Sequence, residues 1–165
     1  MIRKKILLLG DFSVGKTSLI RRYIDKTFDD SYLTTIGVKI SEKELTIDDV
    51  DLKLLIWDVE GATKTKKIPL AYFKGASAAI FVADVSRKDT MSSIANHIET
   101  FLEVNPNANY VIAYNKSDLL SKEEEASLIL PNNSFLSSAK KDENIEILFE
   151  ILAKEIVTQY KEKGR

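Results

Sequence analysis

The segment at residues 10–17, GDFSVGKT, restricts the fold of this chain more than any other feature of the sequence. It matches G-x-x-x-x-G-K-[ST], follows the apolar run at residues 6–9 and precedes a helical pattern. Glycines let such a loop approach an anion closely, and the N–H groups of the loop and of the helix N-terminus then face that anion. Lys16 would supply charge to the outer phosphates, and Thr17 a hydroxyl to Mg²⁺. The segment therefore predicts a phosphate-binding loop between a buried strand and a helix.

Apolar runs of strand length alternate with helical patterns along the rest of the chain. Strands are expected at residues 6–9, 38–47, 52–57, 78–85, 110–114 and 135–136, with a turn at 48–51. Helices are expected at residues 17–24, 94–102, 121–129 and 145–156, the third with a candidate capping box at Ser121 and Glu124. This alternation predicts an α/β fold in one domain, residues 1–165: a doubly wound, mostly parallel six-stranded sheet with helices on both faces. Ligands in such folds bind beyond the carboxyl ends of the strands.

Composition narrows the class of protein. The chain has 165 residues, a net charge of −1 and 44% hydrophobic residues, which gives no reason to expect nucleic acid or an anionic membrane as a bulk partner. It has no cysteine, so this sequence offers no disulfide, thiolate metal site or prenyl anchor. No apolar run approaches the length of a membrane span. We expect a cytoplasmic monomer without a nucleic-acid partner or a direct lipid anchor in this sequence, which meets membranes only through partners.

A second motif, Asn115-Lys116-Ser117-Asp118, follows the strand expected at residues 110–114. The Asp118 carboxylate can accept two hydrogen bonds from the N1–H and the exocyclic amine of guanine, a donor pair that adenine lacks. Asn115 can support the loop, and the stem of Lys116 can cover the base. Alone, this tetrapeptide is a common turn. At the carboxyl end of a strand, downstream of a phosphate loop, it predicts guanine selectivity.

With these motifs in order, the chain resembles the Ras superfamily of small GTPases, whose G domain is a P-loop NTPase fold, and most of all its Rab and Ras branches. The resemblance covers nearly all of residues 6–160; residues 35–37 match the first switch, 57–61 the second switch, and 138–140 the loop that contacts the guanine oxygen. It implies GTP or GDP with Mg²⁺ as cofactors. The implied nucleotide-binding residues are Asp11, Phe12, Ser13, Val14, Gly15, Lys16, Thr17, Ser18, Phe28, Tyr32, Thr35, Gly61, Asn115, Lys116, Asp118, Ser138, Ala139 and Lys140.

The resemblance also implies a metal site and a catalytic centre. Mg²⁺ is expected to bind Thr17 and Thr35, and Asp58 through water. Lys16, Thr35 and Gly61 are expected to act on the reacting phosphate. Asp58 has a plainer interpretation, as a helix cap or the partner of a lysine.

Two aromatic residues and one histidine are open to plainer interpretations as well. Phe28 is expected against the base, but it also fits ordinary core packing. Tyr32 is expected as a lid over the phosphates, or as a merely exposed side chain. His97 lies on the same helical pattern as Ile94 and Ile98 and is expected to have a surface or packing role rather than a chemical one.

Three residues depart from the catalytic pattern of the family. Ala62 stands where most active members carry a glutamine that orients the attacking water, and Phe12 stands where a small residue is usual. From these two residues we predict slow GTP hydrolysis; the alternative is a constitutively GTP-bound scaffold that does not cycle. Glu60 replaces an alanine or glycine. It is a tentative catalytic residue that orients water or tunes Mg²⁺, or else it weakens GTP binding by repelling the γ-phosphate.

The expected partners are effector and regulator proteins that contact residues 30–40 and 60–75. The second of these segments carries four lysines, which favour either an acidic partner or simply an exposed, charged helix. They are Lys64, Lys66, Lys67 and Lys74. Relatives usually end in a lipidated cysteine tail, which this sequence lacks: either a tail was removed or the protein works unlipidated. The guanine motif at residues 115–118 disfavours a P-loop kinase or ATPase.

Overall fold

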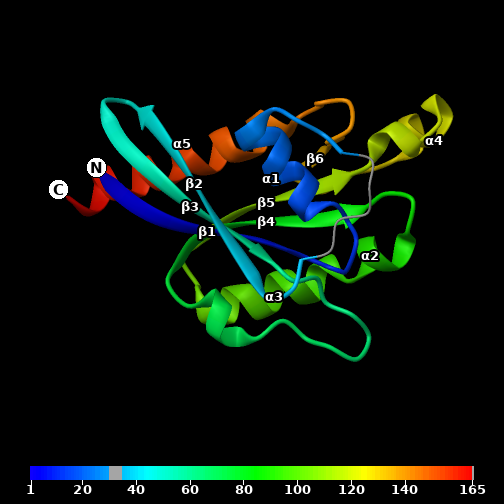
Figure 1. The fold of residues 1–165 in the computed structure, drawn as a ribbon, viewed down its shortest axis with the longest axis horizontal. Coiled ribbons are helices and arrows are strands. Elements are labelled where there is room, and N and C mark those ends of the chain that lie inside the picture. Colours follow the sequence, from blue (N-terminus) through cyan, green and yellow to red (C-terminus); the bar gives the residue numbers. More distant parts are fainter. Residues whose placement is uncertain (30–34, 165) are drawn as a thin grey trace.

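The computed structural model of the chain describes residues 1–29 and 35–164, in which six strands form one sheet (Figure 1). The strands are β1 (Ile2–Gly10), β2 (Val38–Ile47), β3 (Val50–Val59), β4 (Ala76–Asp84), β5 (Asn109–Asn115) and β6 (Ser134–Leu136). Their order is β2-β3-β1-β4-β5-β6, and β2–β3 is the antiparallel pair. The other neighbours are parallel. The predicted mostly parallel α/β sheet is therefore confirmed.

Helices cover both faces of the sheet, as predicted (Figure 1). The helices are α1 (Lys16–Asp25), α2 (Lys88–Ser92), α3 (Ile94–Val104), α4 (Lys122–Ser127) and α5 (Ile145–Lys163), with two short 3-10 helices, η1 (Leu70–Phe73) and η2 (Ser117–Leu119). Residues of α1 and α5 belong to the core on one face, whereas α3 and η1 contribute to the core on the other. One face of the sheet is thus closed by helices from the two ends of the chain, and the other face by helices from its middle.

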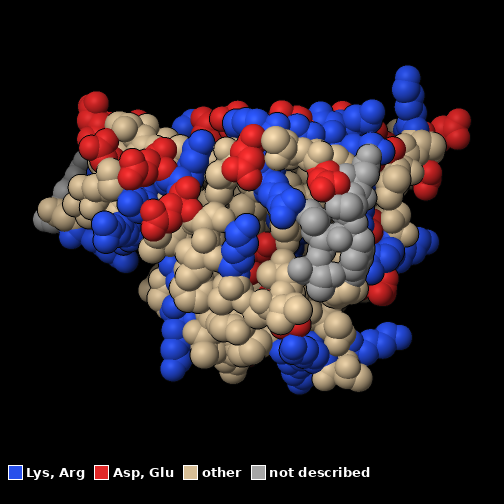
Figure 2. Space-filling model, viewed as in Figure 1, with Lys and Arg blue, Asp and Glu red and all other residues tan. Residues whose placement is uncertain are grey.

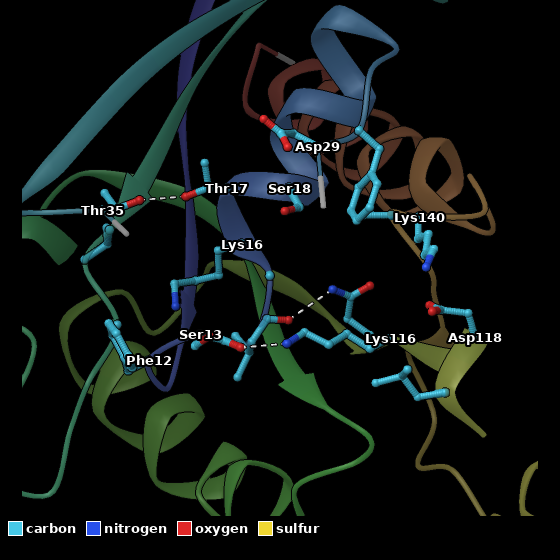
Figure 3. Close-up of a pocket in the computed structure, with 18 residues that line it drawn as sticks. Phe12, Ser13, Lys16, Thr17, Ser18, Asp29, Thr35, Lys116, Asp118 and Lys140 are labelled. Atoms are coloured by element: carbon cyan, nitrogen blue, oxygen red, sulfur yellow. Dashed lines mark hydrogen bonds between the residues drawn. The ribbon is translucent and has the colours of Figure 1, made fainter. Parts of the chain in front are cut away.

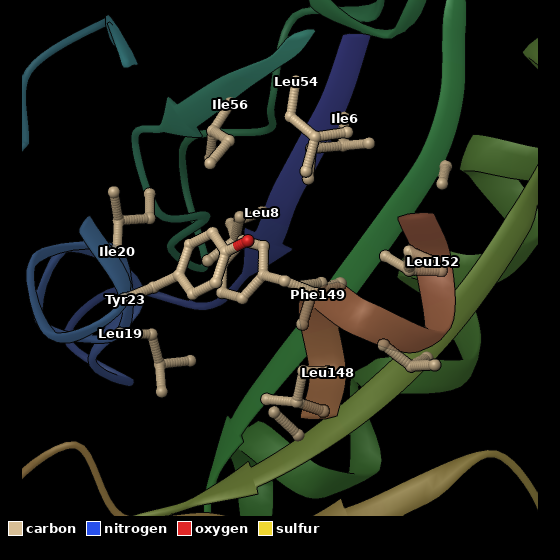
Figure 4. Close-up of a cluster of buried hydrophobic side chains, with 14 of the residues drawn as sticks. Ile6, Leu8, Leu19, Ile20, Tyr23, Leu54, Ile56, Leu148, Phe149 and Leu152 are labelled. Atoms are coloured by element: carbon tan, nitrogen blue, oxygen red, sulfur yellow. The ribbon is translucent and has the colours of Figure 1, made fainter. Parts of the chain in front are cut away.

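Strand β1 shows why both faces need a cover. Its side chains alternate, so Ile6 and Leu8 enter the core beside α1 and α5, while Leu7 and Leu9 enter the core beside α3. On the first face, Tyr23 of α1 stacks on Phe149 of α5, with ring centroids 3.9 Å apart and an angle of 3° between the rings (Figure 4). This stack fixes α1, and with it the loop that precedes α1, against the last helix.

Two helical expectations differ from the structure. The helix expected at residues 121–129 ends at Ser127, although both hydrogen bonds of the capping box between Ser121 and Glu124 are present. The charged segment at residues 63–74, for which an exposed helix was one interpretation, forms no α-helix: residues 63–69 are irregular, and its helical part is the 3-10 helix η1. A proline at position 69 disfavours helical geometry just before it, and Thr63 instead accepts a hydrogen bond from the N–H of Lys66. Lys64, Lys66 and Lys67 therefore lie on an irregular loop.

The parallel arrangement gathers several loops at one edge of the sheet. Strands β1, β3, β4 and β5 all run in the same direction, so the segments that follow Gly10, Val59, Asp84 and Asn115 meet at the carboxyl edge. Basic and acidic side chains are interspersed over the face drawn in Figure 2. Of the helices within residues 1–29 and 35–164, none is long and apolar enough to cross a membrane.

Candidate functional site

A cavity of about 320 Å³ lies at the carboxyl edge of the sheet (Figure 3). Its lining residues are Phe12, Ser13, Val14, Gly15, Lys16, Thr17, Ser18, Phe28, Asp29, Thr35, Val59, Gly61, Asn115, Lys116, Asp118, Leu119, Ala139 and Lys140. The described residues predicted to bind a nucleotide all belong to this lining, except Asp11 and Ser138. Tyr32 lies outside the described residues. Segments more than one hundred residues apart in the sequence, such as the loop before α1 and residues 139–140, thus share one cavity.

The loop between β1 and α1 has the backbone of an anion-binding nest. Ser13 and Gly15 have left-handed φ values of 64° and 101°. A Cβ atom at Gly15 would lie 2.4 Å from Nδ2 of Asn115, so the site needs glycine for space as well as for conformation. None of the described residues accepts a hydrogen bond from the N–H of Ser13, Val14 or Gly15. Three successive backbone donors at a cavity wall suit an anionic ligand.

Lys16 is the buried cation of this loop, with 6% of its surface exposed. Its Nζ atom donates to the carbonyl oxygens of Gly10 and Asp11, at 3.3 and 2.9 Å. Burial lowers the pKa of Lys16 to about 8, and Asp58 and Asp11 oppose this shift. An anion in the cavity would favour the charged form of the amine, so binding of the anion and protonation of Lys16 are coupled.

Three oxygen-bearing side chains meet at one end of the cavity. The Thr17 hydroxyl lies 2.6 Å from that of Thr35 and donates to Oδ2 of Asp58 at 2.6 Å, and the Thr35 hydroxyl lies 3.2 Å from the same carboxylate oxygen. Burial raises the pKa of Asp58, against the hydrogen bond from Thr17 and the charge of Lys16. The other carboxylate oxygen, Oδ1, is buried and has no hydrogen-bond partner among the described residues.

This donor set fits Mg²⁺. The cation prefers oxygen ligands and commonly takes one or two carboxylates together with phosphate oxygens and water. The buried, unpartnered oxygen of Asp58 is an acceptor for a metal-bound water, and the two threonine hydroxyls lie beside it. Within the described residues, no three histidine, aspartate or glutamate side chains gather as an all-protein metal cage. Thr17, Thr35 and Asp58 are therefore the group that would hold the ion beside a phosphate.

The opposite end of the cavity carries the motif that was predicted to select the base. Asp118 and Lys140 lie across the cavity from Thr35 (Figure 3). The Ser138 hydroxyl donates to Oδ1 of Asp118 at 2.7 Å, which fixes the orientation of that carboxylate. Arg22 of α1 donates to the carbonyl oxygens of residues 139 and 140, at 2.7 and 3.0 Å. Sequence reasoning missed Arg22, because its contacts lie more than one hundred residues away along the chain.

Phe12 and Ala62, two of the three residues that depart from the family pattern, are joined through backbone hydrogen bonds. The N–H of Phe12 donates to the carbonyl of Ala62 at 2.9 Å, and the N–H of Ala62 donates to the carbonyl of Gly10 at 3.1 Å. A Cβ atom at Gly61 would lie 2.5 Å from Cα of Phe12, so residues 61–62 lie directly on the loop at residues 10–17. The Phe12 side chain lines the cavity on the side of Lys16 and Thr35 (Figure 3). Ala62 contributes no side-chain hydrogen-bonding group there.

Glu60 connects Gly37 with Lys66. One oxygen of its carboxylate accepts from the N–H of Gly37 at 3.2 Å, and the other lies 2.9 Å from Nζ of Lys66. The hydrogen bonds from Lys66 and then Gly37 lower the pKa of Glu60. Among the described residues, the cavity lining includes Gly61 but not Glu60. The carboxylate of Glu60, which was expected near the phosphates, is thus paired with Gly37 and Lys66.

His97 has a partner that its place in a helical pattern did not suggest. Its Nε2 atom lies 2.8 Å from Oδ1 of Asp11, and the Ser93 hydroxyl donates to the other oxygen of Asp11 at 2.5 Å. These bonds tie α3 to the outer side of the phosphate loop. Sequence reasoning also missed Arg87 and Asp84: Arg87 donates to the carbonyl of Phe12 in the same loop, and Asp84 contacts Arg87 and Lys116. A buried aspartate at the end of the apolar strand β4 was the signal that could have found them.

Comparison with known proteins is consistent with this geometry. The model of the Ras family matches residues 5–158. Two relatives, each named Ras-related protein Rab-1, come from Theileria annulata and Theileria parva. Each is 35% identical to this chain over 171 aligned positions, which cover 94% of this chain and 76% of the relative.

Proposed function

This chain belongs to the Ras family, as a Rab- and Ras-like small GTPase, and from that premise we propose that it is a molecular switch that binds GTP and GDP together with Mg²⁺. One observation carries the proposal: a single cavity is lined by Lys16 and by Asp118. Lys16 suits a phosphate and Asp118 a guanine. A nucleotide would therefore span the cavity, with its base beside Asp118 and its phosphates on residues 10–17.

In the proposed complex, each end of the cavity has a separate task. Asp118, oriented by Ser138, accepts from the two guanine donors, and a base without them would leave a carboxylate unpaired. The loop N–H groups and Lys16 bind the phosphates. Thr17, Thr35 and Asp58 hold Mg²⁺, which when bound neutralises charge on the outer phosphate oxygens. Thr35 and Gly61 then report the γ-phosphate to residues 30–40 and 60–75.

Effector and regulator proteins are proposed to bind these two segments, residues 30–40 and 60–75. Among the described residues of both segments, Ile36, Ile40 and Leu70 are 85%, 50% and 55% exposed. Large exposed apolar side chains beside charged ones suit a protein interface. We place this activity in the cytoplasm, with membranes reached through protein partners.

Slow hydrolysis is the second part of the proposal. Ala62 cannot orient a water molecule with its side chain, and Phe12 lines the cavity where an incoming arginine would approach. We expect single-turnover hydrolysis at or below the intrinsic rate of Ras, about 3–5 × 10⁻⁴ s⁻¹, with little response to an ordinary activator. A rate well above that value would refute this part and leave nucleotide binding intact.

A constitutively GTP-bound scaffold is the alternative function, and the same two residues support it. The nucleotide retained on purification separates the two. Mostly GDP supports a protein that cycles, whereas mostly GTP supports the scaffold. The primary test of binding is a titration with fluorescent GDP, GTP and ADP, with and without Mg²⁺. We expect tight guanine nucleotide binding that Mg²⁺ strengthens; equal affinity for ADP would contradict the proposal.

Glu60 is proposed to act on nucleotide exchange rather than on the attacking water, because both of its carboxylate oxygens already contact the switch segments. Glu60→Ala is expected to alter GDP release while leaving hydrolysis within about twofold. Lys66→Ala is the matched control, because it removes the ion pair but keeps the carboxylate. A change confined to hydrolysis in Glu60→Ala would support water orientation instead, and no change in either assay would leave Glu60 without such a role.

A further inference from the structure

Three consecutive carbonyl groups of the phosphate loop each accept a hydrogen bond from outside the loop. Arg87 donates to the carbonyl of Phe12 at 2.6 Å, and Lys116 donates to that of Ser13 at 3.0 Å, a bond drawn in Figure 3. Asn115 donates to the carbonyl of Val14 at 3.0 Å. The loop is therefore held, peptide by peptide, by side chains at or just beyond the carboxyl ends of β4 and β5.

These bonds determine where the N–H groups of the loop point. In a trans peptide, the C=O of one residue and the N–H of the next point in opposite directions. A donor that holds the carbonyl of Phe12 thereby directs the N–H of Ser13 away from that donor. The same relation links Ser13 to the N–H of Val14, and Val14 to that of Gly15. These are the three backbone donors without an acceptor among the described residues, and they belong to the cavity lining.

Asp84 fixes two of the three external donors. Its Oδ2 atom lies 3.3 Å from Nε of Arg87 and 3.1 Å from Nζ of Lys116, and its side chain is only 3% exposed. Ser86 donates to the other oxygen through both its N–H and its hydroxyl, each within 2.9 Å. Burial alone would raise the pKa of Asp84, but the hydrogen bonds from Ser86 and Lys116 hold it below its ordinary value. The carboxylate is thus a charged, fully partnered anchor.

The ion pair between Arg87 and Asp84 differs from an ordinary surface ion pair, because Arg87 also contacts a second acceptor. Exposed pairs contribute little to stability, and 38% of the Arg87 side chain is exposed. However, its planar guanidinium donates from Nε to Asp84 and from the terminal nitrogen to the loop carbonyl. A planar fork of this kind holds both acceptors in one fixed geometry, whereas the donors of an ammonium, such as that of Lys116, rotate freely. Its charge also reaches Lys16, whose pKa it helps to lower.

We propose that Arg87, anchored by Asp84, is a positioning residue of the phosphate loop: it fixes the peptide between Phe12 and Ser13 so that the Ser13 N–H faces the phosphates. This inference rests on the proposed guanine nucleotide function and deepens it. Because loops of this type cradle the α- and β-phosphates with backbone N–H groups, Arg87 sets how tightly the β-phosphate is held. Its effect is on the phosphate end of the site and not on the base end.

The test compares GDP release from the Mg²⁺-loaded wild-type protein with release from Arg87→Ala. Loss of a hydrogen bond from a charged donor is expected to speed release about tenfold. Lys88→Ala is the matched control, because it removes the same charge from the adjacent, exposed position, and its release rate is expected to stay within about twofold of wild type. Equal rates in the two variants would overturn the proposal, since only the net charge would then matter.

A spectroscopic measurement separates positioning from general loosening. The ³¹P resonance of the β-phosphate of bound GDP is expected to shift in Arg87→Ala, while the resonances of the bound guanine base stay in place. Faster release with an unmoved β-phosphate resonance would overturn the proposal. If Arg87→Ala does not fold, Arg87→Gln and Arg87→Lys replace it. The glutamine variant is expected to release GDP faster than the lysine variant, which retains a charged donor, and equal rates would overturn the proposal.

These outcomes are distinct from failure of the proposed function. If wild-type protein binds no GDP, the guanine nucleotide proposal fails before any variant is compared. If wild-type protein binds GDP and the Arg87 variants release it at the wild-type rate, the function stands and the positioning role is refuted.

Discussion

Lys16 provides a quantitative test of the phosphate site, because its protonation is coupled to anion binding. In the free protein, burial lowers the pKa of this amine to about 8. A bound phosphate raises that pKa again, so the complex carries a fully protonated Lys16 near neutral pH. The number of protons taken up on binding then equals the deprotonated fraction of Lys16 in the free protein. GDP affinity is therefore fully present well below pH 8 and weakens as the pH rises through 8.

The expected uptake follows from the pKa of Lys16. For a group that titrates near pH 8, GDP binding should take up almost no proton at pH 6.5, about half a proton near pH 8 and nearly a whole proton at pH 9.5. Isothermal titration in buffers of different ionisation enthalpy measures this number directly. The folding stability of the nucleotide-free protein depends on pH in the opposite direction to the GDP affinity. The unfolded chain binds more protons between pH 8 and 10.5, the ordinary pKa of lysine, so Lys16 makes the free protein more stable as the pH rises through that range.

Lys16→Arg is the control, because a guanidinium remains protonated throughout this range. In this variant, GDP binding should involve almost no proton uptake at position 16. Any proton uptake by the guanine nucleotide itself should be the same in both proteins. Uptake near zero at pH 8 in the wild type would refute the coupling. Equal uptake in the wild type and in Lys16→Arg would assign the proton to another group.

Three further predictions concern the core, the loop and the catalytic centre. Phe149→Ala removes the ring stacked on Tyr23 and should cost about 3–5 kcal/mol of unfolding free energy in urea denaturation, and a loss under 1 kcal/mol would contradict the role of this stack. Gly15→Ala combines a positive φ with a contact to Asn115; it should lower stability by at least about 1–2 kcal/mol and abolish GDP binding, so wild-type binding in a titration would refute the close fit of the loop. Ala62→Gln should raise single-turnover GTP hydrolysis at least about tenfold, and an unchanged rate would mean that the missing water-orienting group is not what slows hydrolysis.

The sheet and the ligand-binding motifs were predictable because they depend on local patterns. The apolar run at residues 6–9 marked β1, and the alternation at residues 38–47 gave β2 its correct bounds. The start of β1 was missed because Lys5 is polar. In the structure, its amine lies 3.6 Å from the ring centroid of Trp57, which lets a basic residue sit within the strand. The five-residue helix α2 is too short to show a periodicity.

The contacts that shape the site were much less predictable. The guanidinium of Arg87 meets the carbonyl of Phe12 across 75 positions of the chain, and His97 meets Asp11 across 86. No local pattern encodes such a pair, because strand order brings the two segments together. Glu60 could be identified as unusual from the sequence. Its contacts with Gly37 and Lys66 depend on how residues 35–37 and 60–66 fold, which no motif specifies.

The nucleotide retained by the purified protein tests the central claim most directly. The protein would be purified in Mg²⁺-containing buffer and denatured, and the released material separated by ion-exchange chromatography against nucleotide standards. We predict GDP or GTP at close to one molecule per chain, and loss of that nucleotide from Asp118→Ala. An adenine nucleotide in its place, or guanine nucleotide retained undiminished by Asp118→Ala, would contradict the assignment of this cavity as a guanine nucleotide site.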